Sequence, residues 1–207
     1  MAVTARKVDD LERRTRRRFT LQRSLRENSG RLFLRAEIAR ANEPSLNGRL
    51  FTRETLERMI LNFERPKLGT REHPSTSSSS CSDSSSCPSH VVLDVRFSSD
   101  DRDVVEVILE VLLTSREGKF IAERYRNGNF VGCSIRGWGS EHPIDRKNVD
   151  RDATMKGKVL ALEEEDEKKK EVVIVDVKDF ELITVDVVDE PSHTRAYLEP
   201  IGYSLLS

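Results

Sequence analysis

Ser134 is the side chain whose surroundings are most typical of a chemical nucleophile. It lies among Gly132, Gly137 and Gly139, with Arg136 two residues further along the chain. Glycine accepts backbone conformations that other residues avoid, so the three glycines predict a tight bend that presents the hydroxyl. A serine hydroxyl is a weak nucleophile until a base removes its proton and a third group orients that base. The rest of the sequence must therefore supply a base and an orienting group.

Two separate segments supply candidates for these roles. His73 stands directly before Pro74, which fixes the following turn and disfavours a helix at the histidine. Asp186 lies between Val185 and Val187 in an apolar run typical of a strand. Its carboxylate should point to the side opposite the valines, either into a cleft or into solvent. A serine, a histidine and an aspartate in separated segments predict acyl-transfer chemistry.

Other residues compete for the same roles. His90, which begins a strand after Ser89, is the rival base, and Asp189 is the alternative orienting carboxylate. His142 lies too close to Ser134 in the sequence to be a favoured partner, and His193 is expected in a surface loop. Each of these residues also has a purely structural alternative. Serines are common in turns, and histidines often stabilise loops.

Five short motifs occur along the chain in one order. They are Leu-Asn-Gly-Arg-Leu-Phe at 46–51, Leu-Gly-x-x-x-His-Pro at 68–74, Ser-His-Val-Val at 89–92, Gly-x-Ser-x-Arg-Gly-x-Gly at 132–139 and Asp-Val-Val-x-x-Pro-Ser at 186–192. In this order they resemble the tailed-phage prohead maturation proteases, serine peptidases related in fold to the herpesvirus capsid maturation protease. The resemblance runs from about Leu34 to Pro200.

The resemblance implies a role for each candidate. Ser134 would attack a peptide carbonyl, His73 would accept and then donate the proton, and Asp186 would hold the imidazole in the productive tautomer. Backbone amides near Arg136 and Gly137 would meet the oxyanion, with the charge of Arg136 either nearby or used structurally. No cofactor and no metal is implied.

The resemblance also implies a biological setting. The protein would be a serine endopeptidase that cleaves capsid and scaffold proteins, and itself, during procapsid maturation. Its location would be the interior of the viral procapsid, in the host cytoplasm. A homo-oligomer is compatible with this interpretation.

Three features depart from the family's pattern. Thr70, Arg71 and Glu72 precede the histidine where family members often carry Gly-Glu. Ile135 follows Ser134 where a second serine is frequent. A Ser-rich insert at 75–89 leaves the shape of the loop beside the histidine open.

The expected fold class is α+β, a mostly antiparallel β-barrel surrounded by helices, like the herpesvirus protease. The barrel, closed or nearly closed, would span residues 32–200, between a basic arm at 1–31 and a short tail at 201–207. Alternating apolar residues predict strands at 31–41, 90–97, 103–113, 155–161, 172–177 and 180–188. Helices are predicted from the N-cap Thr52 to Pro66 and over 115–125, and a charged hairpin tip over 162–170.

Composition limits the class of protein. The chain has 207 residues, of which 36% are hydrophobic and 34% charged, which suits a single domain with one core. No segment approaches the roughly 20 apolar residues of a transmembrane helix. The N-terminus is basic without an apolar stretch, so it does not resemble a secretory signal. These features predict a cytoplasmic protein.

The N-terminal arm suggests a competing function. Residues 1–31 hold ten Lys or Arg against four Asp or Glu, although the whole chain has a net charge of −1. Such an arm could contact nucleic acid or an acidic scaffold through weak, non-specific electrostatics, or could simply be a solvated tail. The alternative to an enzyme is therefore a capsid assembly or nucleic-acid-binding protein that works through this arm.

The cysteines do not predict a disulfide framework or a zinc site. Three cysteines leave one unpaired, and an intracellular chain keeps them reduced. Cys81 and Cys87 are further apart than the usual zinc knuckle spacing, and Cys133 is expected to be a small packed residue. A serine esterase is disfavoured because Arg136 takes the place of the second glycine of the Gly-x-Ser-x-Gly elbow.

Overall fold

A computed structural model describes residues 30–72, 87–129, 131–143, 173–175 and 178–201. Within these residues the fold is α+β, with three β-sheets and two α-helices. Most neighbouring strands are antiparallel, which agrees with the fold class expected from the sequence. The basic arm up to residue 29, the predicted strand 155–161 and the predicted hairpin tip 162–170 lie outside the described residues.

The largest sheet has five antiparallel strands. In spatial order they are β10 (Glu199–Ile201), β1 (Leu32–Arg40), β5 (Val104–Val111), β4 (Pro88–Phe97) and β3 (Lys67–Thr70). The predicted hairpin is confirmed as β4 and β5, in which Phe97 pairs with Val105. Its turn is closed by the N–H of Ser98, which donates to the carbonyl of Val104 at 2.8 Å. β4 begins at Pro88, inside the segment expected to form the Ser-rich loop.

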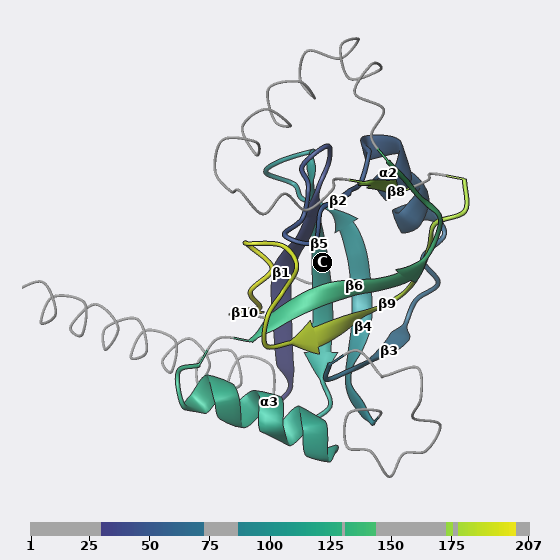
Figure 1. Cartoon of the computed structure of the whole chain (residues 1–207). Helices are drawn as coiled ribbons and strands as arrows, with labels where there is room; N and C mark the ends of the chain where they lie inside the picture. The colour runs from purple at the N-terminus through teal and green to yellow at the C-terminus, as the bar shows by residue number, and fades with distance from the viewer. Residues whose placement is uncertain (1–29, 73–86, 130, 144–172, 176–177, 202–207) are drawn as a thin grey trace, which may run out of the picture.

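A two-stranded ribbon crosses one face of this sheet (Figure 1). It consists of β6 (Gly132–Trp138) and β9 (Glu181–Val188), which pair antiparallel. A third, smaller sheet joins β2 (Arg49–Leu50), β8 (Val173–Val175) and β7 (Glu141–Pro143), with β2 and β8 parallel. The ribbon is the element that carries the predicted nucleophile and the predicted carboxylate.

The hydrophobic core lies between the ribbon and the five-stranded sheet. Leu34 of β1, Val107 of β5 and Val185 of β9 belong to one buried cluster. Fully burying such a side chain contributes about 1.5–3 kcal/mol, so the cluster fixes the ribbon against the sheet. A smaller cluster that contains Phe33 and Ile108 covers part of the sheet's other face.

The described strands do not close into the expected barrel. Three separate hydrogen-bonded sheets are present instead. Their edges meet only through single bridges, from Arg71 beyond β3 to Val187 of β9 and from Gly132 of β6 to Tyr197 before β10. The physical reason is length, because β3 and β10 have four and three residues and end where a continuous ladder would have to form.

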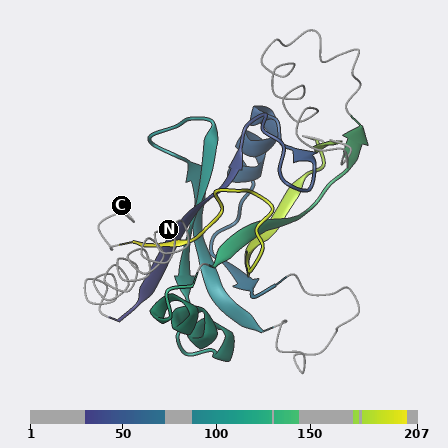
Figure 2. The ribbon, with the colours of Figure 1, turned by 60° about the vertical axis from the view of Figure 1, so that its left-hand side comes forward.

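Two capped helices lie at opposite ends of the five-stranded sheet, as both Figure 1 and Figure 2 show. α2 (Arg53–Leu61) begins as predicted at the N-cap Thr52, whose side chain accepts from the N–H of Thr55. It ends at Leu61, ahead of Pro66, because Asn62 caps it by donating to the carbonyls of the last turn. α3 (Arg116–Arg126) is capped in the same way by Ser115.

α3 places its predicted apolar residues on different faces. Ile121 and Tyr125 are buried against the core as expected. Phe120 is instead 40% exposed and lies on the outer side of the helix. Among the described residues, neither helix has the length and apolar character needed to cross a bilayer.

Candidate functional site

Ser134 lies inside strand β6 and not on the tight bend that its glycines predict. It pairs with Asp186 of β9 across the antiparallel ladder, so both side chains project from the same face of the ribbon. The nearby glycines are needed for close packing. A Cβ atom on Gly137 would lie 2.7 Å from the ring of Phe180, and one on Gly132 would lie 2.8 Å from Pro191.

The Ser134 hydroxyl lies where two surface hollows meet. The larger hollow, judged by the residues that line it, runs along β6 towards Trp138, and a smaller one lies beside Asp189 and Pro191. Ser134 and Ser192 line both hollows, and their hydroxyl oxygens are 3.3 Å apart. Ser134 is 9% exposed, which gives it a low but real accessibility to a bound molecule.

The larger hollow has a mixed lining. Ile38, Phe51, Val175 and Phe180 supply apolar surface. Three arginines and two glutamates supply charge, namely Arg40, Arg49, Arg136, Glu43 and Glu141. A hollow that combines apolar surface with a few charged groups is typical of a site that binds an organic ligand or a peptide side chain.

Asp186 is fully buried and held by several donors. Its Oδ1 accepts from the backbone N–H of Thr70 at 3.0 Å and from the Thr70 hydroxyl at 3.1 Å. The guanidinium of Arg136 forms an ion pair with it, with Nε 2.9 Å from Oδ2. Asp186 therefore faces neither solvent nor an open cleft, and the valines on either side of it are buried as well.

Asp189, the alternative carboxylate, lies at the end of the same ribbon but outside the core. Its side chain is 52% exposed and forms an ion pair with Arg124 of α3 at 3.0 Å. It lines the second hollow together with Ser134. Asp186 is the more enclosed of the two carboxylates and is the one in register with Ser134.

His73, the predicted base, lies outside the described residues. Glu72, the residue directly before it in the chain, is described and lines the second hollow with Ser134. The N–H of Glu72 donates to the carbonyl of Val187 at 2.7 Å, which attaches this part of the chain to β9. The segment that leads into His73 thus reaches the edge of the hollow that contains Ser134.

His90, the rival base, is sealed inside the protein. Its Nε2 is 2.7 Å from the carbonyl of Val185, and its Nδ1 is 2.8 Å from the hydroxyl of Ser89. A carbonyl only accepts, so Nε2 carries the proton and Nδ1 accepts from Ser89. Burial holds the pKa of His90 below its ordinary value. With its acceptor nitrogen occupied and its ring fully buried, His90 has a structural role.

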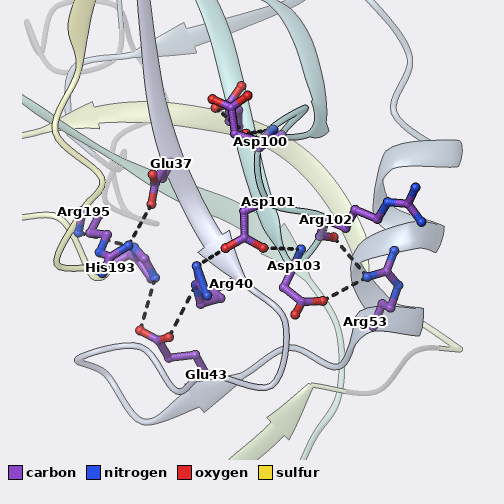
Figure 3. A network of polar contacts seen from close by, with 12 residues as sticks. Glu37, Arg40, Glu43, Arg53, Asp100, Asp101, Arg102, Asp103, His193 and Arg195 are labelled. Atoms are coloured by element: carbon purple, nitrogen blue, oxygen red, sulfur yellow. Dashed lines mark hydrogen bonds and ion pairs between the residues drawn. The ribbon is translucent and has the colours of Figure 1, made fainter.

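His193 is not the surface residue that the sequence suggests. It is 6% exposed, lines the larger hollow and has its Nε2 4.0 Å from Glu43. Figure 3 shows the ring among Glu37, Glu43 and Arg195, within a chain of ion pairs that continues to Arg40. Burial lowers the pKa of His193, while Glu43 and Glu37 oppose that shift. His142 is an exposed residue of β7.

The predicted oxyanion residues have defined partners. Arg136 forms the ion pair with Asp186 and also lines the larger hollow, where Ser134 lies. Gly137 pairs with Leu182 just after an irregularity in the β6–β9 ladder. Such an irregularity re-aims backbone groups, as β-bulges do next to many active sites.

The described residues include two cysteines, Cys87 and Cys133. Cys133 is completely buried, and burial raises the pKa of its thiol, which confirms it as a packed residue. Cys81 lies outside the described residues. Within the part of the chain that the structure describes, no group of three or more histidine, cysteine or acidic side chains is placed to hold a metal ion.

Two residues next to Ser134 and Asp186 were not singled out from the sequence. Ser192 lies in the Pro-Ser end of the last motif, so a signal was present, but nothing placed its hydroxyl beside Ser134. Thr70 holds Asp186 from a strand more than a hundred residues away in the chain, and this contact has no local signal.

Comparison with known proteins finds a likeness in structure and not in sequence. No protein-family model matches the chain, and no curated protein sequence matches it. Among solved structures, the capsid assembly protease gp21 of bacteriophage T4 matches with a TM-score of 0.52 and 17% sequence identity. The match covers 75% of this chain and 80% of that protein. The resemblance to phage prohead proteases expected from the sequence is thereby confirmed in the fold.

Proposed function

We propose that the protein is a serine endopeptidase of viral procapsid maturation, with Ser134 as nucleophile, His73 as base and Asp186 as orienting carboxylate. The observation that carries the proposal is the position of Ser134, directly opposite a buried aspartate and at the junction of two hollows. A peptidase must hold the chain on both sides of the bond that it cuts. Two hollows that meet at one hydroxyl suit that requirement.

His73 fits the role of base because of its covalent neighbour. A trans peptide bond holds consecutive Cα atoms about 3.8 Å apart, and Glu72 already lines the hollow that contains Ser134. His90 and His193 are less suitable. His90 has its acceptor nitrogen occupied, and His193 lies beside the carboxylates of Glu37 and Glu43.

The chemistry follows the general course of acyl transfer by serine. The Ser134 oxygen would bond to the peptide carbonyl carbon while His73 takes the hydroxyl proton. The same proton would then pass to the leaving amine, and water would release the acyl group by the reverse sequence. Asp186 would hold the imidazole in the correct tautomer and stabilise its positive charge. Arg136 and Thr70 would serve by holding the Asp186 carboxylate in place.

Backbone amides at the irregularity around Arg136 and Gly137 are the proposed oxyanion donors. Removing one such donor typically costs about 100-fold to 1000-fold in rate. The packing of Gly137 against Phe180 would therefore matter to catalysis, because it fixes the backbone at this point.

The substrates are proposed by analogy with the structural neighbour, which is a capsid assembly protease. We expect this chain to act on capsid and scaffold proteins, and on itself, inside the procapsid. A homo-oligomer and contacts of the basic arm with nucleic acid or an acidic scaffold are further parts of the proposal.

The test separates two hydroxyls that are 3.3 Å apart. Wild type, Ser134→Ala and Ser192→Ala would each be incubated with the capsid and scaffold proteins of the same virus, and all fragments weighed by intact-mass analysis. We expect cleavage to vanish in Ser134→Ala and to persist, at a reduced rate, in Ser192→Ala. A fluorophosphonate should modify Ser134 in the wild type. Unchanged cleavage in Ser134→Ala would overturn the proposal and favour the assembly or nucleic-acid-binding alternative.

A further inference from the structure

One face of α3 carries a group of charged contacts that the proposed chemistry does not use. Glu117 and Arg124 of α3 bind residues that come from two different strands. Arg71, just beyond β3, pairs with Glu117, and Asp189, just beyond β9, pairs with Arg124. α3 therefore connects the two chain segments that border the second hollow.

The pair between Arg71 and Glu117 is the most enclosed of these contacts. Nε of Arg71 donates to Oε2 of Glu117 at 2.7 Å. The Glu117 side chain is only 4% exposed, and that of Arg71 is 25% exposed. A buried carboxylate that loses its cation is strongly unfavourable, so the position of Arg71 is firmly set by Glu117.

Phe120 strengthens the same connection. The guanidinium of Arg71 lies 4.6 Å from the centre of the Phe120 ring, and that of Arg124 lies 6.0 Å from it. Both distances are within the range of cation–π attraction. The partly exposed Phe120 ring therefore has two cationic partners.

Glu72, the residue after Arg71, connects the ion pair with Glu117 to the hollow that contains Ser134. Its carboxylate accepts from the N–H of Asp189 at 3.3 Å, and its carbonyl oxygen lies 2.9 Å from the Thr70 hydroxyl, whose single proton is shared between this carbonyl and Asp186. Its φ of 61° lies in the left-handed region that a non-glycine residue adopts only when its surroundings impose it. Arg71 on one side and these bonds on the other hold that conformation directly before His73.

We propose that Arg71 is a positioning residue, which through its ion pair with Glu117 fixes the His73-bearing segment relative to Ser134. This inference rests on the proposed function for its catalytic consequence.

The test compares two arginine–glutamate pairs of similar construction. Glu117→Gln breaks the pair with Arg71, and Glu110→Gln breaks a matched pair on the other face of the five-stranded sheet. In that control pair Nε of Arg31 donates to Glu110 at 2.7 Å, and the guanidinium lies 4.8 Å from the ring of Phe33. Each variant removes the negative charge of a glutamate whose arginine partner also lies near an aromatic ring.

Two readouts are needed. The first is the rate at which a fluorophosphonate modifies Ser134, measured by mass spectrometry over a range of pH. The second is the NMR signal of the His73 ring, identified by its loss in His73→Gln among the four histidines of the chain. The second readout does not depend on the protein being an enzyme.

We expect Glu117→Gln to slow modification of Ser134 by about 10-fold to 100-fold, to move its pH profile and to shift the His73 signal, because small displacements at a site are costly. Glu110→Gln should do none of these. Arg71→Lys, which keeps the charge, should retain more of the rate than Arg71→Met and also serves if Glu117→Gln fails to fold. Equal behaviour of Glu117→Gln and Glu110→Gln would overturn the inference. If Ser134 of the wild type does not react, the proposed function fails, and the His73 signal alone decides whether Arg71 positions the segment.

Discussion

His90 and His193 are both buried histidines that contact or follow the β6–β9 ribbon, yet the protein surrounds them differently. His90 is fully buried, and both of its ring nitrogens have hydrogen-bond partners. His193 is 6% exposed and lines a hollow, and its Nε2 has no hydrogen-bond partner within the described structure. The comparison teaches that burial alone does not give a histidine its role. The partners of each nitrogen do.

The two histidines also differ in what they hold together. His90 joins β4 to the ribbon, because its Nε2 donates to Val185 while its own strand belongs to the five-stranded sheet. His193 belongs to a chain of charges that includes Glu43 and Arg40 along the rim of the larger hollow (Figure 3). His90 is therefore part of the scaffold under the site, and His193 is part of the site's lining.

Replacing each histidine by alanine should separate the two roles most strongly. His90→Ala removes two hydrogen bonds and leaves a cavity in the core, so we expect a loss of about 3–4 kcal/mol in the free energy of unfolding. His193→Ala should cost only about 1–2 kcal/mol, because its ring borders a hollow that water can fill. Urea unfolding of both variants measures the difference. Equal losses would mean that the comparison is wrong.

Gly69→Ala tests the space that His90 occupies. A Cβ atom at this position would lie 2.1 Å from Nε2 of His90 and 2.6 Å from the carbonyl oxygen of Val185. Overpacking of this kind typically costs about 1–3 kcal/mol, and we expect about 2–3 kcal/mol here. Leu68→Ala, one residue away at a side chain 58% exposed, is the control and should change stability by about 0.5 kcal/mol at most.

The same substitution has an internal check. In a His90→Ala background the cost of Gly69→Ala should fall, because the ring that it meets is gone, but should not vanish, because Val185 remains. If the losses in free energy of unfolding from the two substitutions simply add, then the space left by Gly69 is not needed for the His90 ring.

The local elements could be predicted from the sequence because their signals are local. Thr52 and Ser115 cap the two helices as their side-chain chemistry favours, and valine-rich alternation marked the β4–β5 hairpin. The motif order also predicted the fold likeness, which the T4 protease match confirms. The helices and the hairpin depend on residues that lie close together in the chain, and the fold likeness depends on the order of the five motifs.

The arrangement of the site depended on long-range register and could only partly be predicted. The pairing of Ser134 with Asp186 joins positions that are 52 residues apart and is set by the ladder as a whole. The glycines around Ser134 predicted a bend, but the structure uses Gly132 and Gly137 to admit Pro191 and Phe180 to the strand. A sequence shows that a residue is glycine and does not show which neighbour needs the space.

Charged residues misled the sequence interpretation for a related reason. Histidine in a polar context predicts a surface loop, yet His193 is 6% exposed and lies beside Glu37 and Glu43. Glu117 stands in the first turn of α3, where an acidic side chain is usually solvated, yet it is buried and paired with Arg71. Both partners come from distant parts of the chain, so no local pattern could reveal them.

The smallest expected effect is a difference between His90 and His193 in how they make the stability of the protein depend on pH. The pKa of each buried histidine is lowered by burial, and the lowering is opposed by Asp186 at His90 and by Glu43 and Glu37 at His193. Between the native pKa and the unfolded value of about 6.5, the unfolded chain binds more protons than the native protein. Stability contributed by the neutral rings is thus complete above that unfolded value and is lost as the pH falls towards the native pKa.

His90→Gln should flatten the fall in urea midpoint between about pH 7.5 and pH 5.5 more than His193→Gln does, because His90 is the more deeply buried ring. If the urea midpoint of His90→Gln falls with pH as much as that of the wild type, then other groups cause the acid sensitivity. This distinction between the two histidines would then be wrong.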